Sequence, residues 1–229
     1  MPLRKLWRKR LKLNNRGSAI VTVIVVTIFI TIVATTMLFV SGRNYIMKQT
    51  DYQNTKSFYS AEETLDKLKE LLVPEVDKAF DVAYRDMMRN YASFSTDDER
   101  LRYYVDSFTT ELDDEWADKL ALSGTPLATV RKFMEDQGAS PDMTKLITNV
   151  AGFQIVSIDN KNRFVIKGVE VYYVDDRGFS AYLTTDIALT PPDYKADSTT
   201  PDPADPAAPA EPDKMNMSEY VIYVNWKKN

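Results

Sequence analysis

The side chains in this sequence that could carry out acid–base or metal chemistry are carboxylates. The chain has 33 Asp and Glu residues but neither His nor Cys. It therefore lacks an imidazole base, a thiol nucleophile, a Ser-His-Asp triad, the usual nitrogen and sulfur ligands of zinc, and disulfides. What remains is three acidic clusters: Asp97-Asp98-Glu99, Asp113-Asp114-Glu115 and Asp175-Asp176.

None of the acidic clusters has the spacing of a calcium-binding loop. Paired carboxylates could act as an acid and a base, so an acid-dependent hydrolase is one hypothesis, although no motif supports it. Helix caps, solvated helix faces and a turn explain the same residues without catalysis. We expect no cofactor and no metal, and a protein that is not an enzyme.

The N-terminal segment has the most distinctive composition. Residues 1–17 form a basic leader with seven Lys and Arg and no acid, and residues 18–40 are 23 consecutive uncharged residues. A helix of that length spans about 34 Å, enough to cross a hydrocarbon core of roughly 30 Å. The run is too long for a cleavable secretory signal. The positive charge before it predicts a cytoplasmic N-terminus and a C-terminal domain outside the cytoplasmic membrane.

The domain after the span is acidic. Residues beyond position 42 hold all 33 acids and 22 of the 29 bases, a net charge of −11. Such a surface repels a phosphate backbone, so we expect no nucleic acid as a partner.

Two motifs resemble those of type IV pilins and pseudopilins. Asn15-Arg16-Gly17, followed by Ser18-Ala19-Ile20-Val21 and the apolar run, resembles their class III signal peptide. Phe58-Tyr59-Ser60-Ala61-Glu62-Glu63-Thr64-Leu65 is similar to the signature that follows the membrane span in minor components of the PilX and GspK types. Together the motifs cover residues 10–72. The resemblance implies cleavage between Gly17 and Ser18 by a prepilin peptidase, and methylation of the new N-terminus.

The resemblance implies a minor pilin or pseudopilin of a type IV pilus or of a related secretion or competence filament. Its partners would be other pilin or pseudopilin subunits, the prepilin peptidase, the pilus assembly platform and the membrane. After assembly the subunit would lie in a pilus or pseudopilus at the cell surface. The alternative is a permanently anchored, single-pass extracellular sensor or adhesin.

Three features of the long N-terminal helix bear on its role. Major pilins usually carry Glu at the fifth mature position, which is Thr22 here. That departure favours an initiating or tip-associated subunit, unless Thr22 is an ordinary membrane residue. Thr27, Thr31 and Thr35 form a polar strip whose hydroxyls should bond the carbonyl one turn back, or which could be a packing seam. Glu62 could pair with a neighbouring subunit or cap a local backbone group.

The order of periodicities, helices first and strands later, predicts an α+β fold, and the resemblance implies that its architecture is pilin-like. The long helix should continue over residues 41–72 with an apolar stripe, and Pro74 should end or kink it. Residues 73–150 should be helical, residues 151–190 an antiparallel sheet, 191–218 a Pro-rich linker and 219–229 a last strand that returns to the sheet. The members of the stripe are Phe58, Ala61, Leu65, Leu68 and Leu72.

Local signals predict where the later elements begin and end. A helix should run from Val76 to about Asn90, and a capping box at residues 96–99 should open the next, with Leu101, Val105, Phe108, Leu112 and Trp116 on its inner face. Thr125-Pro126 and Ser140-Pro141 should start two short helices. Strands are expected at 153–158, 164–174 and 179–189, with turns at 159–162 and 175–178.

Overall fold

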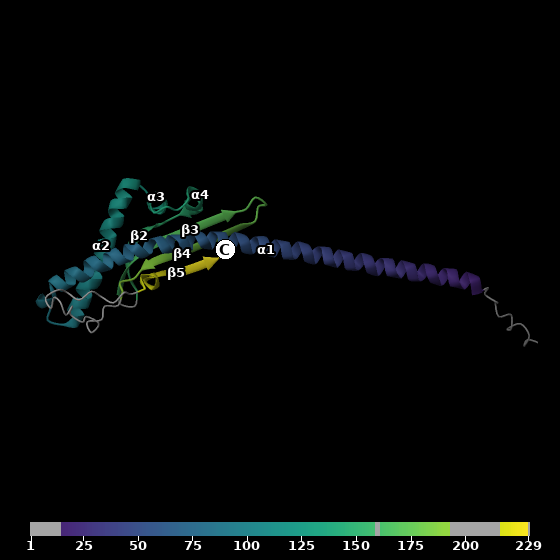
Figure 1. Ribbon diagram of the computed structural model, residues 1–229, viewed down its shortest axis with the longest axis horizontal. Coiled ribbons are helices and arrows are strands. Elements are labelled where there is room, and N and C mark those ends of the chain that lie inside the picture. Colours follow the sequence, from purple (N-terminus) through teal and green to yellow (C-terminus); the bar gives the residue numbers. More distant parts are fainter. Residues whose placement is uncertain (1–14, 159–160, 193–215, 229) are drawn as a thin grey trace, which may run out of the picture. The chain divides into compact units, whose positions relative to one another are not determined.

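The computed structural model describes residues 15–158, 161–192 and 216–228 of the chain. The protein is α+β: a long N-terminal helix precedes shorter helices and then an antiparallel sheet (Figure 1). This order confirms the predicted α+β class. The chain divides into two compact units, residues 1–53 and residues 54–229.

The N-terminal helix α1 runs from Asn15 to Arg89 and passes through Pro74. The prediction that a separate helix begins at Val76 is therefore wrong. Pro74 removes one backbone donor, but the residues on both sides of it, Leu72 and Val76, are completely buried in the same core. Burial of the stripe thus holds the helix together across the proline. The stripe continues through Ala79, Phe80, Ala83 and Met87.

The next elements follow their capping signals. After a 3-10 turn η1 (Tyr91–Ser93), helix α2 (Asp97–Ser123) opens with the predicted capping box at Thr96 and Glu99 and ends at Gly124, whose φ is 80°. Its buried residues include Val105, Phe108, Leu112 and Trp116 as expected. Leu101 is 38% exposed, so its expected place on the inner face is wrong. The buried stripe begins at Tyr104 instead.

Helices α3 (Pro126–Asp136) and α4 (Pro141–Thr144) begin where the Thr-Pro and Ser-Pro pairs predicted. The short strand β1 (Ile147–Asn149) follows, at the end of a region that was expected to be helical throughout. Ile147 pairs with Val171 and is completely buried, so contact with the sheet determines the local conformation there.

The sheet has the order β1-β3-β4-β5, with β2 also paired to β3, and all its pairs are antiparallel. Its strands are β2 (Gly152–Ile158), β3 (Lys161–Val174), β4 (Ser180–Leu189) and β5 (Val221–Lys228). Lys161 and Asn162 pair with Ile158 and Ser157, so the turn predicted at 159–162 is shorter than expected. Residues 159–160 lie outside the described part.

The last strand returns to the sheet as predicted, and it pairs with the strand before it in sequence. Val221 is opposite Leu189. Most of the Pro-rich linker, residues 193–215, lies outside the described residues. At its ends, Pro191 and Pro192 are buried, and residues Met217–Tyr220 form the 3-10 helix η3.

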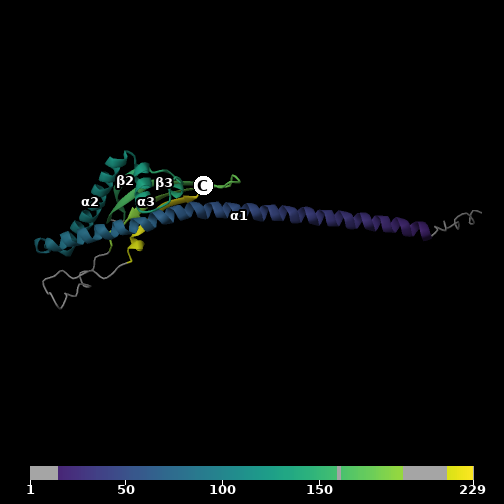
Figure 2. The ribbon, with the colours of Figure 1, turned by 45° about the horizontal axis from the view of Figure 1, so that its top comes forward.

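The core of the second unit lies between the sheet, the second half of α1, and α2 and α3 (Figure 2). As the alternation predicted, Ala181, Leu183, Thr185, Ile187 and Leu189 of β4 are buried. Trp116 is completely buried, and its ring centroid lies 5.2 Å from Phe133 and 4.9 Å from Phe153. Aromatic packing thus joins α2, α3 and β2.

Strand β5 is attached to α1 by polar as well as apolar contacts. The hydroxyl of Tyr223 donates a hydrogen bond to Asp66 Oδ1 at 2.9 Å, and burial, together with this carboxylate, raises the pKa of Tyr223. Lys228 Nζ lies 4.1 Å from the centroid of the Phe58 ring. The strand therefore covers part of the stripe on α1.

We predict that deletion of residues 219–229 destabilises the second unit. The deletion removes the completely buried Val221 and the Tyr223 bond and uncovers β4, so the loss should be about 3 kcal/mol or more and should lower the melting temperature by about 10 °C. Circular dichroism during thermal unfolding measures the change. A chain that lacks only residues 227–229 is the matched control and should melt within a few degrees of the parent. An unchanged melting temperature for the larger deletion would contradict the role of β5.

Candidate functional site

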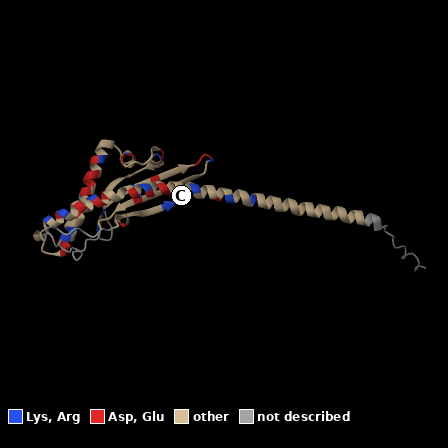
Figure 3. Cartoon of the chain, viewed as in Figure 1, with Lys and Arg blue, Asp and Glu red and all other residues tan. Residues whose placement is uncertain are grey.

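Residues 19–40 of α1 expose a continuous apolar surface. Its most apolar 18-residue window has a mean hydropathy of 2.7, and none of that window is buried. Large side chains such as Val23, Phe29 and Leu38 are 64, 66 and 74% exposed. No charged residue interrupts this stretch in Figure 3. The helix is long and apolar enough to cross a membrane.

The residues expected to take part in processing lie at the start of this helix. The backbone of Gly17 and Ser18 is helical, within the first residues of α1. Thr22, which stands where major pilins carry Glu, lies one turn further along and has an exposed side chain. The roles of these three residues stay predictions.

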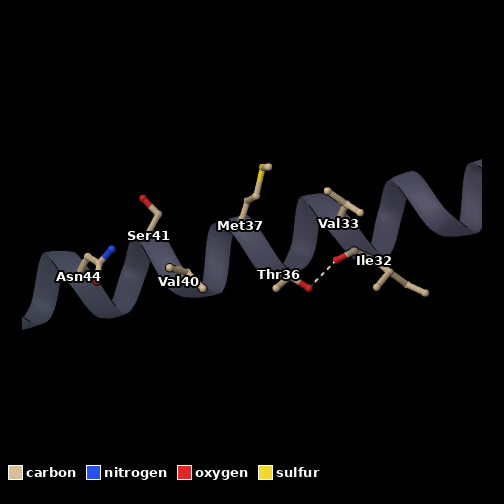
Figure 4. A pocket seen from close by; sticks show the side chains of 7 residues that line it. All are labelled: Ile32, Val33, Thr36, Met37, Val40, Ser41 and Asn44. Atoms are coloured by element: carbon tan, nitrogen blue, oxygen red, sulfur yellow. Dashed lines mark hydrogen bonds between the residues drawn. The ribbon is translucent and has the colours of Figure 1, made fainter.

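The threonine strip forms the predicted bonds to the helix backbone. The hydroxyls of Thr27, Thr31 and Thr35 donate to the carbonyls of Val23, Thr27 and Thr31, each at 2.8 Å. Thr36 makes the same bond to Ile32, as Figure 4 shows. Because each hydroxyl hydrogen is already used within the helix, the threonines can face lipid or another helix without an unpaired donor.

A shallow groove runs along this helix and involves both apolar and small polar side chains (Figure 4). Its lining residues are Ile32, Val33, Thr36, Met37, Val40, Ser41 and Asn44. Small and hydroxylated side chains let helix backbones approach closely in lipid. The groove extends the candidate packing surface beyond the predicted threonine strip.

Glu62 belongs to the second unit and is half-buried, between the buried Ala61 and Leu65. Its charge is among the causes that raise the pKa of Tyr223 on β5, after burial and Asp66. Within residues 15–158, 161–192 and 216–228 it forms no hydrogen bond or ion pair, so no local cap is observed there. A contact between Glu62 and a neighbouring subunit stays a prediction.

Two of the three acidic clusters have the structural roles that the sequence indicated. Glu99 accepts hydrogen bonds from the backbone of Ser95 at 2.7 Å and of Thr96 at 3.3 Å. Asp175 Oδ1 accepts from the backbone of Arg177 and Phe179, at 2.9 and 2.8 Å, in the turn between β3 and β4. In the described part of the chain, no group of three or more acidic residues could hold a metal ion.

The third acidic cluster behaves differently because Glu115 joins an ion cluster between α1 and α2. Glu115 Oε2 lies 2.9 Å from Lys78 Nζ, and Glu115 Oε1 lies 3.0 Å from Lys119 Nζ. Lys119 also contacts Glu75 Oε2 at 2.9 Å. Two carboxylates and two ammonium groups thus alternate across the two helices. Glu75, Glu115 and Lys119 also line a cavity of about 250 Å³ whose other walls belong to α2 and α3.

The pKa values of the two carboxylates in this ion cluster shift in opposite directions. Burial raises the pKa of Glu75 more strongly than Lys119 lowers it. Burial also acts to raise the pKa of Glu115, but the hydrogen bonds from Lys78 and Lys119 outweigh it and lower that pKa. Glu115 is therefore the carboxylate whose ionised form stabilises the α1–α2 contact.

The sequence shows which members of this ion cluster share a helix face, but not that the two helices meet there. Glu115 and Lys119 are four residues apart on α2, and Glu75 and Lys78 are three apart on α1, spacings that place each pair on one helix face. Nothing in the sequence shows that the two faces meet, so the sequence predicts a solvated helix face for Glu115. That prediction is wrong.

Comparison with known proteins provides no relative. The chain matches no protein-family model, and neither the curated proteins nor the solved structures contain a match to it.

We predict that Glu115→Gln destabilises the second unit more than Glu75→Gln. At neutral pH, Glu115→Gln should cost about 1–3 kcal/mol because two lysines lose their ionised partner, whereas Glu75→Gln should cost less than about 1 kcal/mol because it also removes a desolvated charge. Urea unfolding followed by tryptophan fluorescence measures both.

The pH dependence of the two variants should have opposite sign. The contribution of Glu115 is present above its unfolded pKa, near 4.5, and is lost as the pH falls through its lower folded pKa. The contribution of Glu75 is present below 4.5 and is lost as the pH rises through its raised folded pKa. The deficit of Glu115→Gln should therefore shrink in acid. Equal deficits for the two variants at every pH would contradict this assignment.

Proposed function

We propose that this chain is a minor pilin or pseudopilin, an initiating or tip-associated subunit of a type IV pilus or of a related secretion or competence filament. The observation that carries the proposal is the exposed, uncharged helix that directly follows a basic leader and the Asn15-Arg16-Gly17 junction. The same helix continues into a separate α+β unit. A removable leader and an apolar helix are what a subunit needs to leave the membrane for a filament.

The second unit supports the same proposal through its architecture. The stripe formed by Ala61, Leu65, Leu68 and Leu72 is completely buried, and the antiparallel sheet lies beside it. A helix whose second half packs on an antiparallel sheet is the arrangement expected of a pilin-like fold. The stripe includes Ala61 and Leu65 of the segment that resembles PilX-type and GspK-type components.

The distribution of charge supports the orientation of the precursor. The basic leader would remain in the cytoplasm, and the acidic second unit would lie outside the cytoplasmic membrane. The prepilin peptidase would cut between Gly17 and Ser18, on the cytoplasmic side. Other pilin subunits and the assembly platform would then receive the apolar helix, and the strip of Thr27, Thr31 and Thr35 would lie within the bundle.

Thr22 supports a terminal rather than a repeating position in the filament. A new N-terminal ammonium buried in an apolar bundle needs a nearby carboxylate, because an unpaired buried charge costs several kcal/mol. Thr22 cannot supply that carboxylate. A subunit at an end of the filament does not have to neutralise a neighbour of its own kind.

We predict that the protein isolated from its native cells begins at N-methylated Ser18. Mass spectrometry of the N-terminal peptide measures this directly. Gly17→Val should block cleavage and leave residues 1–17 attached, because the resemblance places the cut after a small residue. Asn15→Ala, two residues upstream, is the matched control and should be processed like the parent.

An intact leader on the native protein would contradict the proposal. It would indicate a permanently anchored extracellular sensor or adhesin, for which the same exposed helix would be a simple membrane span. A cleaved and methylated chain excludes that alternative, because a permanent anchor needs no such processing.

A further inference from the structure

A polar cluster connects three strands on the face of the sheet opposite the core. Its centre is Asp186 of β4, whose neighbours Thr185 and Ile187 point into the core and are buried. Asp186 Oδ1 accepts a hydrogen bond from the backbone of Gly168 at 2.8 Å. Asp186 Oδ2 accepts one from Lys167 Nζ at 3.0 Å and one from Asn225 Nδ2 at 2.9 Å.

Irregularities in both flanking strands bring these groups to Asp186. The pairing of β3 with β4 shifts between Ile166 and Val169, and the pairing of β4 with β5 shifts between Thr184 and Asp186. Gly168 has a φ of 58°, and a Cβ there would lie 2.9 Å from the Cβ of Ala151, so only glycine fits. Asn225 has the same φ, an uncommon conformation for a residue other than glycine.

Bulges of this kind are usually built features that redirect a side chain. Two of them lie on either side of one carboxylate here. Each is located where the strand beside β4 presents its polar side chain to Asp186, Lys167 from β3 and Asn225 from β5. The cluster therefore holds an amine, a carboxamide and a carboxylate together. The amine and the carboxamide both donate hydrogen bonds to the same oxygen atom, Asp186 Oδ2.

We infer that Lys167 and Asn225 form an intramolecular amide bond, with Asp186 as the catalytic residue that carries the proton. The amine form of Lys167 attacks Cγ of Asn225, and Asp186 Oδ2 accepts a proton from the attacking nitrogen. The new bond joins Nζ to Cγ, the Cγ–Nδ2 bond breaks, and the proton held by Asp186 passes to Nδ2, which leaves as ammonia. No oxidant, reductant or other reactant is needed.

The ionisation of Asp186 suits the first step. Burial acts to raise its pKa, but the bonds from Gly168, Asn225 and Lys167 outweigh burial and lower it. The carboxylate is therefore ionised and can accept the proton that the attacking nitrogen loses once its bond to Cγ has formed. Its side chain is 13% exposed and that of Lys167 is 31% exposed, so both groups are partly shielded from water. Placing the reacting groups in contact with one base removes much of the entropic barrier to the reaction.

The bond would join β3 covalently to β5 across the central strand β4. It would restrict the unfolded chain as a disulfide does, in a protein that has no cysteine. Strand β5, the last element of the fold, would then be secured by a covalent bond in addition to its pairing with β4. This inference does not depend on the proposed filament function.

We predict that the full-length protein, purified from membranes in detergent, has a mass lower than that of its sequence by one ammonia molecule, after allowance for N-terminal processing. Tandem mass spectrometry of a digest should show a branched peptide that joins Lys167 to Asn225. Incubation in a mildly alkaline buffer should complete the reaction, because it increases the amine form of lysine.

Lys167→Arg is the matched control. It keeps a positive charge beside Asp186 but replaces the nucleophilic amine, so the variant should fold, as judged by circular dichroism, and should retain the mass of its sequence. The inference is overturned if folded parent protein keeps the full mass after prolonged alkaline incubation. It is also overturned if Lys167→Arg loses ammonia as the parent does, because the loss would then arise at another residue.

Discussion

The need to cover the apolar surface of α1 is the constraint on which the rest of this protein depends. Between residues 57 and 87 the apolar residues form a single stripe, and the sheet, α2 and α3 bury it. Over residues 19–40 the helix is apolar on all sides, and the described residues leave it exposed. A lipid bilayer and a bundle of similar helices are the environments that cover such a surface. A pilin helix lies first in the bilayer and then in the bundle, so the proposed function rests on this helix.

The polar groups beside these apolar surfaces have hydrogen-bond or ionic partners, which lowers the free-energy cost of burying them. In the apolar helix, the threonine hydroxyls bond the backbone of their own helix. Between α1 and α2, two lysines and two glutamates alternate, so each buried carboxylate has a cationic neighbour. On the outer face of the sheet, Asp186 binds groups from both flanking strands. These clusters make the contacts between elements specific, whereas the apolar stripe supplies most of the stabilisation.

Much of the architecture could be predicted because its signals are local. The capping box at Thr96 and Glu99, the Thr-Pro and Ser-Pro helix starts and the alternation of β4 all depend on neighbouring residues, and all are confirmed. The errors occurred where a distant contact outweighs a local signal. Pro74 does not end α1, because the core holds Leu72 and Val76 on both sides of it. Residues 147–149 form a strand because Ile147 pairs with Val171.

The sequence by itself determined the candidate anchor: the basic leader, the uncharged span, the Gly17–Ser18 junction and the departure at Thr22. The leader and the span follow from charge and hydropathy along a contiguous segment, which need no tertiary contact, and the junction and Thr22 gain their meaning from the resemblance of that segment to type IV pilins. Only the tertiary structure decided that Glu115 meets Lys78, that Tyr223 meets Asp66, and that Lys167, Asp186 and Asn225 share one site. Those residues are far apart in the sequence, and the geometry that joins them depends on strand register, bulges and helix packing, which no local pattern encodes.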